Sequence, residues 1–253
     1  MSTARHRGTV PGGRRYQARV LTERYWHCML GDVWTLLLLL AQAPLIGWLC
    51  TVVWGSVRED TSSLHFVLCL SAVWFGCVNA CREVVKERGV LERERFFGLS
   101  LVSYVWSKVS VLGVLGLVQV LSLQVAVEWE LAVRGPFLVQ TFALWGASVC
   151  GTGLGLLASA LSRTQERAVA AIPLLLLPQI LFSEFAIPEA YFNDTVEVVE
   201  KLMPVRWAYR VFEECAALEP GWGWAALSLL VMIGYAAVLH GLVVLALVPR
   251  REA

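Results

Sequence analysis

The sequence predicts an all-α membrane protein in which an N-terminal amphipathic helix precedes six transmembrane helices. Hydrophobic residues make up 57% of the 253 residues and charged residues only 16%, whereas an ordinary soluble domain has roughly 25% charged residues. The charges are nearly absent from long apolar blocks and crowded between them. Such blocks suit helices that cross a hydrocarbon core about 30 Å thick, which takes about 20 residues.

The first 30 residues contain no apolar block. Residues 1–15 mix arginines with glycines and a proline, and we expect a disordered basic tail there. In residues 16–30, apolar side chains such as Leu21 and Tyr25 recur at helical spacing, and charged ones such as Arg24 fall on the other face. This segment is either an amphipathic helix in the headgroup layer or a cytoplasmic extension of the first span.

The apolar blocks predict spans at about residues 33–54, 61–81, 105–127, 137–161, 166–184 and 221–248. Lipid offers the backbone no hydrogen bonds, so each span should be helical. The fifth span is short and contains two prolines, and Glu184 ends it. That acid either has a function in the outer leaflet, where burial is costly, or is simply exposed. Residues 185–220 are too interrupted to cross, and we expect an external segment that re-enters the outer leaflet.

The distribution of basic residues predicts the orientation. Sixteen of the 21 Lys and Arg residues fall in the tail and first helix, the loops at 82–108 and 162–167, and the C-terminus. This basic side should be cytoplasmic, which puts both termini inside a plasma or inner membrane. The net charge of +1 gives no indication of a nucleic-acid partner.

Cysteines and glycines add weaker signals. Of seven cysteines, only Cys215 falls clearly in a predicted external loop, so no disulfide framework follows. Cys215 is then a free thiol or a link to a partner chain. The run Gly151-Thr152-Gly153-Leu154-Gly155 is similar to a nucleotide-binding loop, but it lies inside the fourth span, where small residues favour close helix packing.

The loop after the second span is the most informative stretch. Residues 82–95 carry nine charges, and like charges recur one turn apart, as with Glu83 and Glu87. Like charges at that spacing weaken an isolated helix, whereas separate acidic and basic stripes suit a protein partner with the complementary pattern. A solvated charged loop explains the run equally well. Gly89 should break the segment into two short helices.

These residues also resemble a known family. The string Arg82-Glu83-Val84-Val85-Lys86-Glu87-Arg88, then Leu91-Glu92-Arg93-Glu94-Arg95, then Gly98-Leu99-Ser100 with Tyr104 and Lys108, is similar to the membrane subunit of ATP-binding-cassette exporters. The variety is the ABC type-2 permease, and within it the G-subfamily. The motif Met203-Pro204-Val205-Arg206-Trp207-Ala208-Tyr209 before the last span resembles that family too, and the resemblance covers residues 16–253.

The resemblance implies specific roles. Residues 16–30 would be the elbow helix, and residues 82–100 would hold the coupling helix. The ATPase-coupling interface it implies consists of six charged residues: Glu83, Glu87, Arg88, Glu92, Arg93 and Glu94. These would pass a motion of the ATPase into the spans and perform no bond chemistry. We expect no catalytic residue and no metal site.

The expected partners follow from what the chain lacks. No phosphate-binding loop is present, since none of the three lysines follows a glycine. ATP and Mg²⁺ would therefore bind a separate ABC ATPase subunit, and a second permease subunit would complete a homodimer or heterodimer in the lipid. The resemblance implies that the second and fifth spans line the pathway. Their apolar and aromatic residues favour a lipid-like or hydrophobic cargo, or else face the lipid: Phe66, Leu70, Trp74, Ile172, Leu176 and Phe182.

Two alternatives compete with transport. An intramembrane enzyme requires polar catalytic residues clustered at one depth, but the spans hold only scattered amides such as Asn79 and Gln119, without acid–base partners. The second alternative is a membrane anchor or assembly factor on the same scaffold that transports nothing; the sequence does not exclude it, and the permease is our interpretation.

Overall fold

The structure is a computed structural model, and it describes residues 13–56, 62–131, 133–183, 185 and 193–248. Every regular element in these residues is a helix, which confirms the all-α prediction. In chain order the elements are α1 (Arg14–Gly31), α2 (Val33–Trp54), α3 (Ser62–Ala80), the 3₁₀ helix η1 (Val85–Glu87), α4 (Arg88–Phe96), α5 (Leu101–Glu128), α6 (Phe137–Leu161), α7 (Gln165–Leu181), α8 (Asp194–Lys201), α9 (Pro204–Ala216) and α10 (Trp222–Leu247).

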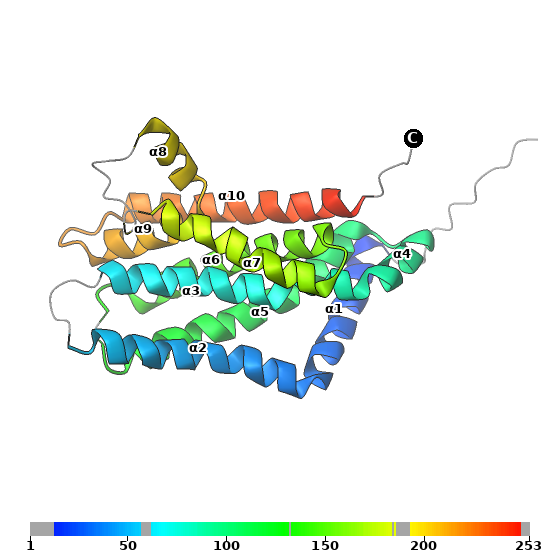
Figure 1. The fold of residues 1–253 in the computed structure, drawn as a ribbon, viewed down its shortest axis with the longest axis horizontal. Helices are drawn as coiled ribbons and strands as arrows, with labels where there is room; N and C mark the ends of the chain where they lie inside the picture. Colours follow the sequence, from blue (N-terminus) through cyan, green and yellow to red (C-terminus); the bar gives the residue numbers. More distant parts are fainter. Residues whose placement is uncertain (1–12, 57–61, 132, 184, 186–192, 249–253) are drawn as a thin grey trace, which may run out of the picture.

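Six helices form an elongated bundle: α2, α3, α5, α6, α7 and α10 (Figure 1). Within the described residues, five helical stretches are long and apolar enough to cross a membrane, and these contain α2, α3, α5, α6 and α10. The remaining predicted span, the fifth at 166–184, corresponds to α7, which has 17 residues, or about 25 Å at 1.5 Å per residue. It lies in the bundle but is shorter than the others and contains Pro173 and Pro178.

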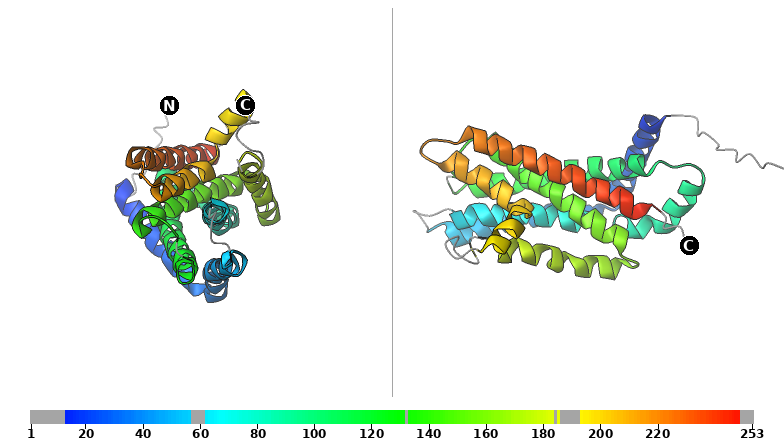
Figure 2. Two further views of the ribbon diagram at one scale, coloured as in Figure 1. Left: turned by 90° about the vertical axis from the view of Figure 1, so that its left-hand side faces the viewer. Right: turned by 90° about the horizontal axis from the view of Figure 1, so that it is seen from above.

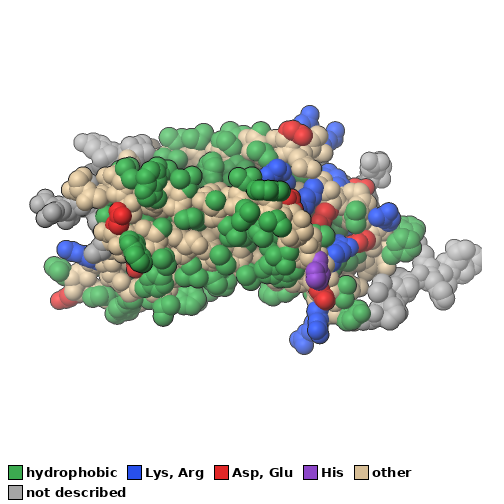
Figure 3. Space-filling view, turned by 90° about the horizontal axis from the view of Figure 1, so that it is seen from below, with side chains coloured by type: hydrophobic (Ala, Val, Ile, Leu, Met, Phe, Trp, Pro, Cys, Tyr) green, Lys and Arg blue, Asp and Glu red, His purple; other side chains and the backbone are tan. Residues whose placement is uncertain are grey.

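Charged side chains gather at the ends of the bundle, and hydrophobic side chains cover its middle (Figure 3). The end that carries α1 and α4 holds most of the charges seen on this face. Helix α1 crosses this end at a steep angle to the bundle (Figure 1) and packs on α5. Only Leu21 and Tyr25 of α1 are buried. The helix begins at Arg14, so the last two residues of the predicted tail are helical, and residues 1–12 lie outside the described part.

The centre of the bundle is the contact between α3 and α6, the most extensive in the molecule. Glycine makes it possible. A Cβ atom on Gly151 would lie 2.2 Å from the Val73 carbonyl oxygen, and one on Gly76 would lie 2.0 Å from the Ser148 carbonyl oxygen. Neither backbone can yield at such distances, so the glycine run of the fourth span serves helix packing, as predicted.

The opposite end is closed by α8 and α9 (Figures 1 and 2). Pro204 opens α9, where its missing N–H group costs nothing, and Val205 N donates to Gln179 Oε1 of α7 at 3.2 Å. The prediction of an external loop around Cys215 is wrong: Cys215 is a buried, free thiol in α9. The sequence signal for this helix is the apolar spacing of Val205, Ala208 and Phe212, three and four residues apart. Glu184 lies outside the described residues.

Candidate functional site

The charged segment, residues 82–100, projects beyond the bundle at the α1 end (Figure 1). After α3 the chain makes a turn over residues 81–84, continues through η1 and turns into α4. The break precedes Gly89, which lies in the first turn of α4 and not between two helices as predicted. Gly98, with a φ of +92°, ends the excursion in a conformation that favours glycine, and α5 begins three residues later.

One face of this segment is fastened to the ends of α6 and α10. The backbone N–H groups of Val84 and Val85 both donate to Ser159 Oγ at 3.0 Å. Arg88 donates to the Ala160 carbonyl oxygen at 2.7 Å, and Arg95 donates to the Leu247 carbonyl oxygen at 2.8 Å. The last carbonyls of a helix have no partner within the helix, and they carry its negative dipole end. The two arginines therefore cap two bundle helices from outside.

A buried charge cluster fastens the segment to α5. Lys108 of α5 is 2% exposed. Its Nζ atom lies 2.8 Å from Glu87 Oε1 and 3.4 Å from Glu83 Oε2. Lys86 pairs with the other oxygen of Glu83 at 2.5 Å, and Tyr104 donates its hydroxyl to Glu87 Oε2 at 3.2 Å. Two acids and two lysines thus balance, with Lys108 buried at the centre and the Lys86 side chain, 40% exposed, at the edge.

Helix α1 completes the charge cluster. The ring of Tyr25 covers Lys108, with Nζ 3.7 Å from the ring centroid, a cation–π contact. Burial, and then the nearby charges of Glu83 and Glu87, raises the pKa of Tyr25 well above its usual value, so the phenol stays neutral. Arg24 pairs with Glu94 of α4 at 2.5 Å, which raises the pKa of the guanidinium. Four segments therefore meet here: α1, the 81–87 turn with η1, α4 and α5.

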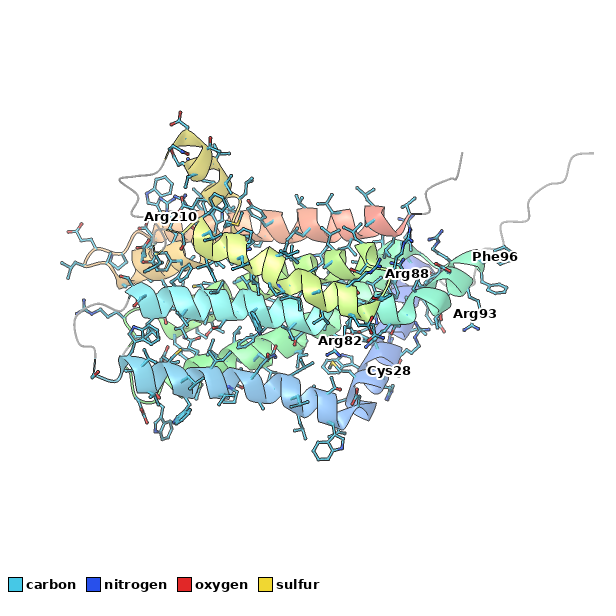
Figure 4. All side chains as sticks on the ribbon, viewed as in Figure 1. Cys28, Arg82, Arg88, Arg93, Phe96 and Arg210 are labelled. Carbon is cyan, nitrogen blue, oxygen red and sulfur yellow. The ribbon has the colours of Figure 1, made fainter. Side chains whose placement is uncertain are left out.

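The other face of α4 is exposed. Phe96 is 88% exposed and Phe97 70% exposed, and their rings meet edge to face with centroids 5.6 Å apart. Val90, Glu92 and Arg93 are exposed beside them. Figure 4 shows Arg93 and Phe96 at the tip, pointing away from the helices. We call these five residues the α4 tip.

The six predicted interface residues therefore divide into three groups. Glu83 and Glu87 face inward to Lys108, and Arg88 and Glu94 are bound to α6 and α1. Glu92 and Arg93 are exposed on the α4 tip. Sequence reasoning missed Phe96 and Phe97. The sequence did contain an indication of their exposure. Two adjacent aromatic residues directly follow a run of charged residues, outside any apolar block that would bury them.

A cavity of about 270 Å³ lies at the opposite end, between α3, α7 and α9. Aromatic rings form one side of it: the Phe66 and Phe185 centroids are 4.6 Å apart, and those of Phe185 and Tyr209 are 5.3 Å apart. Ionised side chains form the other, with Arg206 paired to Glu200 and Arg210 to Glu214. Across the described ranges, no group of three His, Cys, Asp or Glu side chains has a geometry that could hold a metal ion.

Comparison with known proteins gives two findings. The family described as "ABC-2 type transporter" matches residues 16–215. A curated relative, the ABC transporter ATP-binding/permease protein Rv1747 of Mycobacterium tuberculosis, is 25% identical over 163 residues, which is 61% of this chain. The chain spans only 19% of the length of that relative. The family match begins near the start of α1 and includes the charged segment.

Proposed function

The chain belongs to the ABC-2 type transporter family, and from this premise we propose that it is the permease subunit of an ATP-driven exporter whose ATPase is a separate polypeptide. The described residues form the helices of a membrane component, and none of them forms an ATPase domain. ATP and Mg²⁺ would bind on the ATPase. The relative from Mycobacterium tuberculosis combines ATP-binding and permease parts in its name, so both parts exist together in at least one similar protein.

The observation that carries the proposal is the two-sided construction of the charged segment. Its outer side, the α4 tip, exposes two phenylalanines beside the charged residues Glu92 and Arg93. Protein interfaces combine an aromatic centre with a charged rim in the same way. Its inner side is bound to α1, α5, α6 and α10. A partner that pushes the tip would move these helix ends.

The six residues predicted from sequence then take two different roles. Glu92 and Arg93 would contact the ATPase together with Phe96 and Phe97. Glu83, Glu87, Arg88 and Glu94 would transmit the motion instead, because each already has a partner within the chain. We place this end in the cytoplasm, since the sequence has sixteen of its 21 Lys and Arg residues on that side.

Transport would proceed by alternating access between two such subunits, identical or similar. ATP drives it only if the ATPase binds ATP better in one conformation than in the other. We propose that α7 also crosses the membrane, which brings the number of spans to six, and that α3 and α7 line the pathway. The cavity between α3, α7 and α9 joins aromatic rings to ion pairs, which supports a lipid-like cargo with an apolar part and a polar part.

Co-purification with the candidate ATPase tests the proposal, starting with an ATPase that is encoded next to this gene. The variant F96S/F97S should weaken association about tenfold or more, as expected for aromatic residues at the centre of an interface. The variants E87A and R88A should leave association intact and reduce the stimulation of ATP hydrolysis by the permease. F142S is the matched control, since Phe142 is 54% exposed on α6 and far from the tip.

Two results would contradict the proposal. One is unchanged association in F96S/F97S together with unchanged stimulation in E87A and R88A. The other is full association with the ATPase but no movement of any lipid-like compound into or across vesicles on addition of ATP, which would indicate a non-transporting membrane anchor.

A further inference from the structure

A groove runs between α1 and the first turns of α5, and the function proposed above does not use it. It has a volume of about 660 Å³ and is open to the surface. Basic and aromatic side chains make up most of its polar wall: Arg15, Arg19, Trp26 and His27 from α1, and Trp106 from α5. One acid, Glu23 of α1, also lines it, so the two arginines leave an excess of positive charge. Arg15 and Arg19 are exposed and one helical turn apart, so their guanidinium groups lie on one face.

The groove continues into an apolar one through Trp106. This second groove, of about 840 Å³, lies between α5 and α10, and Trp106 lines both. Valine, leucine, alanine and isoleucine side chains make up most of its wall, and Gly241 forms part of its floor on α10. The two grooves together therefore offer a basic, aromatic mouth and a long apolar channel that starts from it.

The position of the grooves decides what occupies them. Helix α10 is the least buried of the five membrane-capable helices, so the apolar groove faces the surrounding hydrocarbon. The mouth is lined by α1, which lies at the charged end of the bundle (Figure 1). A soluble partner cannot reach such a channel, whereas a phospholipid has both parts it needs: a phosphate for two arginines and acyl chains for the groove.

We propose that these grooves bind one phospholipid of the leaflet next to α1, and that Arg15 and Arg19 select an anionic headgroup. The phosphate lies between the two guanidinium groups, and Trp26 and Trp106 pack at the level of the glycerol, where aromatic rings are favoured. Acyl chains follow α5 and α10. The lipid thereby joins α1 to α10, two helices at the end where the charged segment is fastened.

The binding test uses the full chain in vesicles and needs no ATPase, so it fails or succeeds independently of the proposed function. Spin-labelled phosphatidylglycerol and phosphatidylcholine are compared in phosphatidylcholine vesicles, and the motionally restricted fraction of each is measured. Wild-type protein should prefer phosphatidylglycerol several-fold. Near a membrane each arginine contributes on the order of fivefold in affinity for anionic lipid, so R15Q/R19Q should bring the ratio close to one.

A matched pair separates the groove from general surface charge. R163Q/R167Q removes the same charge from another exposed part of the same end, the loop after α6 and the first turn of α7, and should keep the preference. If both double variants lose the preference for phosphatidylglycerol equally, the effect is diffuse electrostatic attraction and the proposal is overturned. The proposal is also overturned if wild-type protein restricts equal fractions of phosphatidylglycerol and phosphatidylcholine.

The apolar groove has its own test. A Cβ atom on Gly241 would meet nothing within 4 Å, so G241L fills the groove without a clash. It should reduce the restricted fraction of both lipids. Gly234 has the same open surroundings on α10 but does not line the groove, so G234L is the control and should behave as wild type. Identical results for G241L and G234L would exclude the groove as the acyl-chain site.

Discussion

Removing the charge of Lys108 is the most direct test of the charge cluster. In K108M the side chain keeps its length and loses the ammonium group that lies between Glu87 and Glu83 at 2.8 and 3.4 Å. Breaking a buried ion pair by removing one partner costs about 3–5 kcal/mol, because the other charge stays buried and uncompensated. Two features place this case at the lower limit: Glu83 keeps Lys86 at 2.5 Å, and the side chain of Glu87 is 24% exposed.

We therefore expect K108M to lower the free energy of unfolding by about 3 kcal/mol, a change of about a hundredfold in the unfolding constant. Equilibrium unfolding in mixed micelles with increasing dodecyl sulfate, followed by circular dichroism, measures it. In K108M the Glu87 carboxylate loses its lysine partner, and E87Q removes the charge of that carboxylate. The double variant K108M/E87Q should accordingly lose less than the sum of the single losses, with a coupling of about 1–2 kcal/mol.

The matched control is K201M. Lys201 pairs with Glu197 one turn away, but the two side chains are 49% and 55% exposed, so water replaces the pair and the variant should unfold like wild type. If K108M unfolds at the same detergent fraction as K201M, or if the double-variant losses add, the cluster does not hold the charged segment to α5.

Two shorter predictions concern packing and sidedness. G151A should destabilise the protein by about 1–3 kcal/mol or more in the same assay, because its Cβ would lie 2.2 Å from the Val73 carbonyl oxygen, whereas G234A on α10, with nothing within 4 Å, should have little effect. A membrane-impermeant maleimide should label wild-type protein only at Cys28, the one exposed cysteine of the seven, and only after the cytoplasmic face of the vesicles is opened; labelling of sealed, right-side-out vesicles would reverse the orientation.

The helices were predictable because long apolar runs and charged interruptions follow from the thickness of a bilayer. Residues 33–54 and 137–161 coincide with α2 and α6. Helix α5 differs: it begins at Leu101, four residues before the predicted span, and its 28 residues make it about 42 Å long. Lys108, which the charge count assigned to the loop at 82–108, lies within it. From sequence alone, a lysine beside an apolar span is assigned to the loop, because burying its charge costs free energy. That cost is small only where acidic partners lie close to the lysine in the folded protein. Glu83 and Glu87 supply them from a segment that folds back, which periodicity does not reveal.

The same argument explains the amides. Asn79, Gln119 and Gln124 looked scattered along separate spans, yet Asn79 donates to Gln119 Oε1 at 2.6 Å and Gln119 donates to the Leu39 carbonyl oxygen at 2.6 Å. Thr141 likewise donates to Gln124 Oε1 at 2.7 Å. These bonds join α2, α3, α5 and α6, and they satisfy groups that lipid would leave unpaired. A pairing of this kind depends on the relative rotation of helices, which a single sequence does not contain.

The fastenings of the charged segment also predict which helices move together. Its hydrogen bonds and ion pairs reach α1, α5, α6 and α10. Helix α7 lies at the edge of the bundle (Figure 2), packs against η1 and is joined by a hydrogen bond through Gln179 to α9 at the far end. A push on the α4 tip should carry the ends of α6 and α10 with it and change their distance to α7.

Spin labels at E92C and L245C, on α4 and α10, should then give the same distance with and without ATP in the complex. Labels at E92C and L174C, on α4 and α7, should give two different distances, one without ATP and one with it. Both replaced leucines are exposed, at 66% and 70%, so the labels should not disturb packing. If the α4–α10 distance changes as much as the α4–α7 distance, Arg95 does not hold α10 to the charged segment during the cycle, and the caps serve only the resting structure.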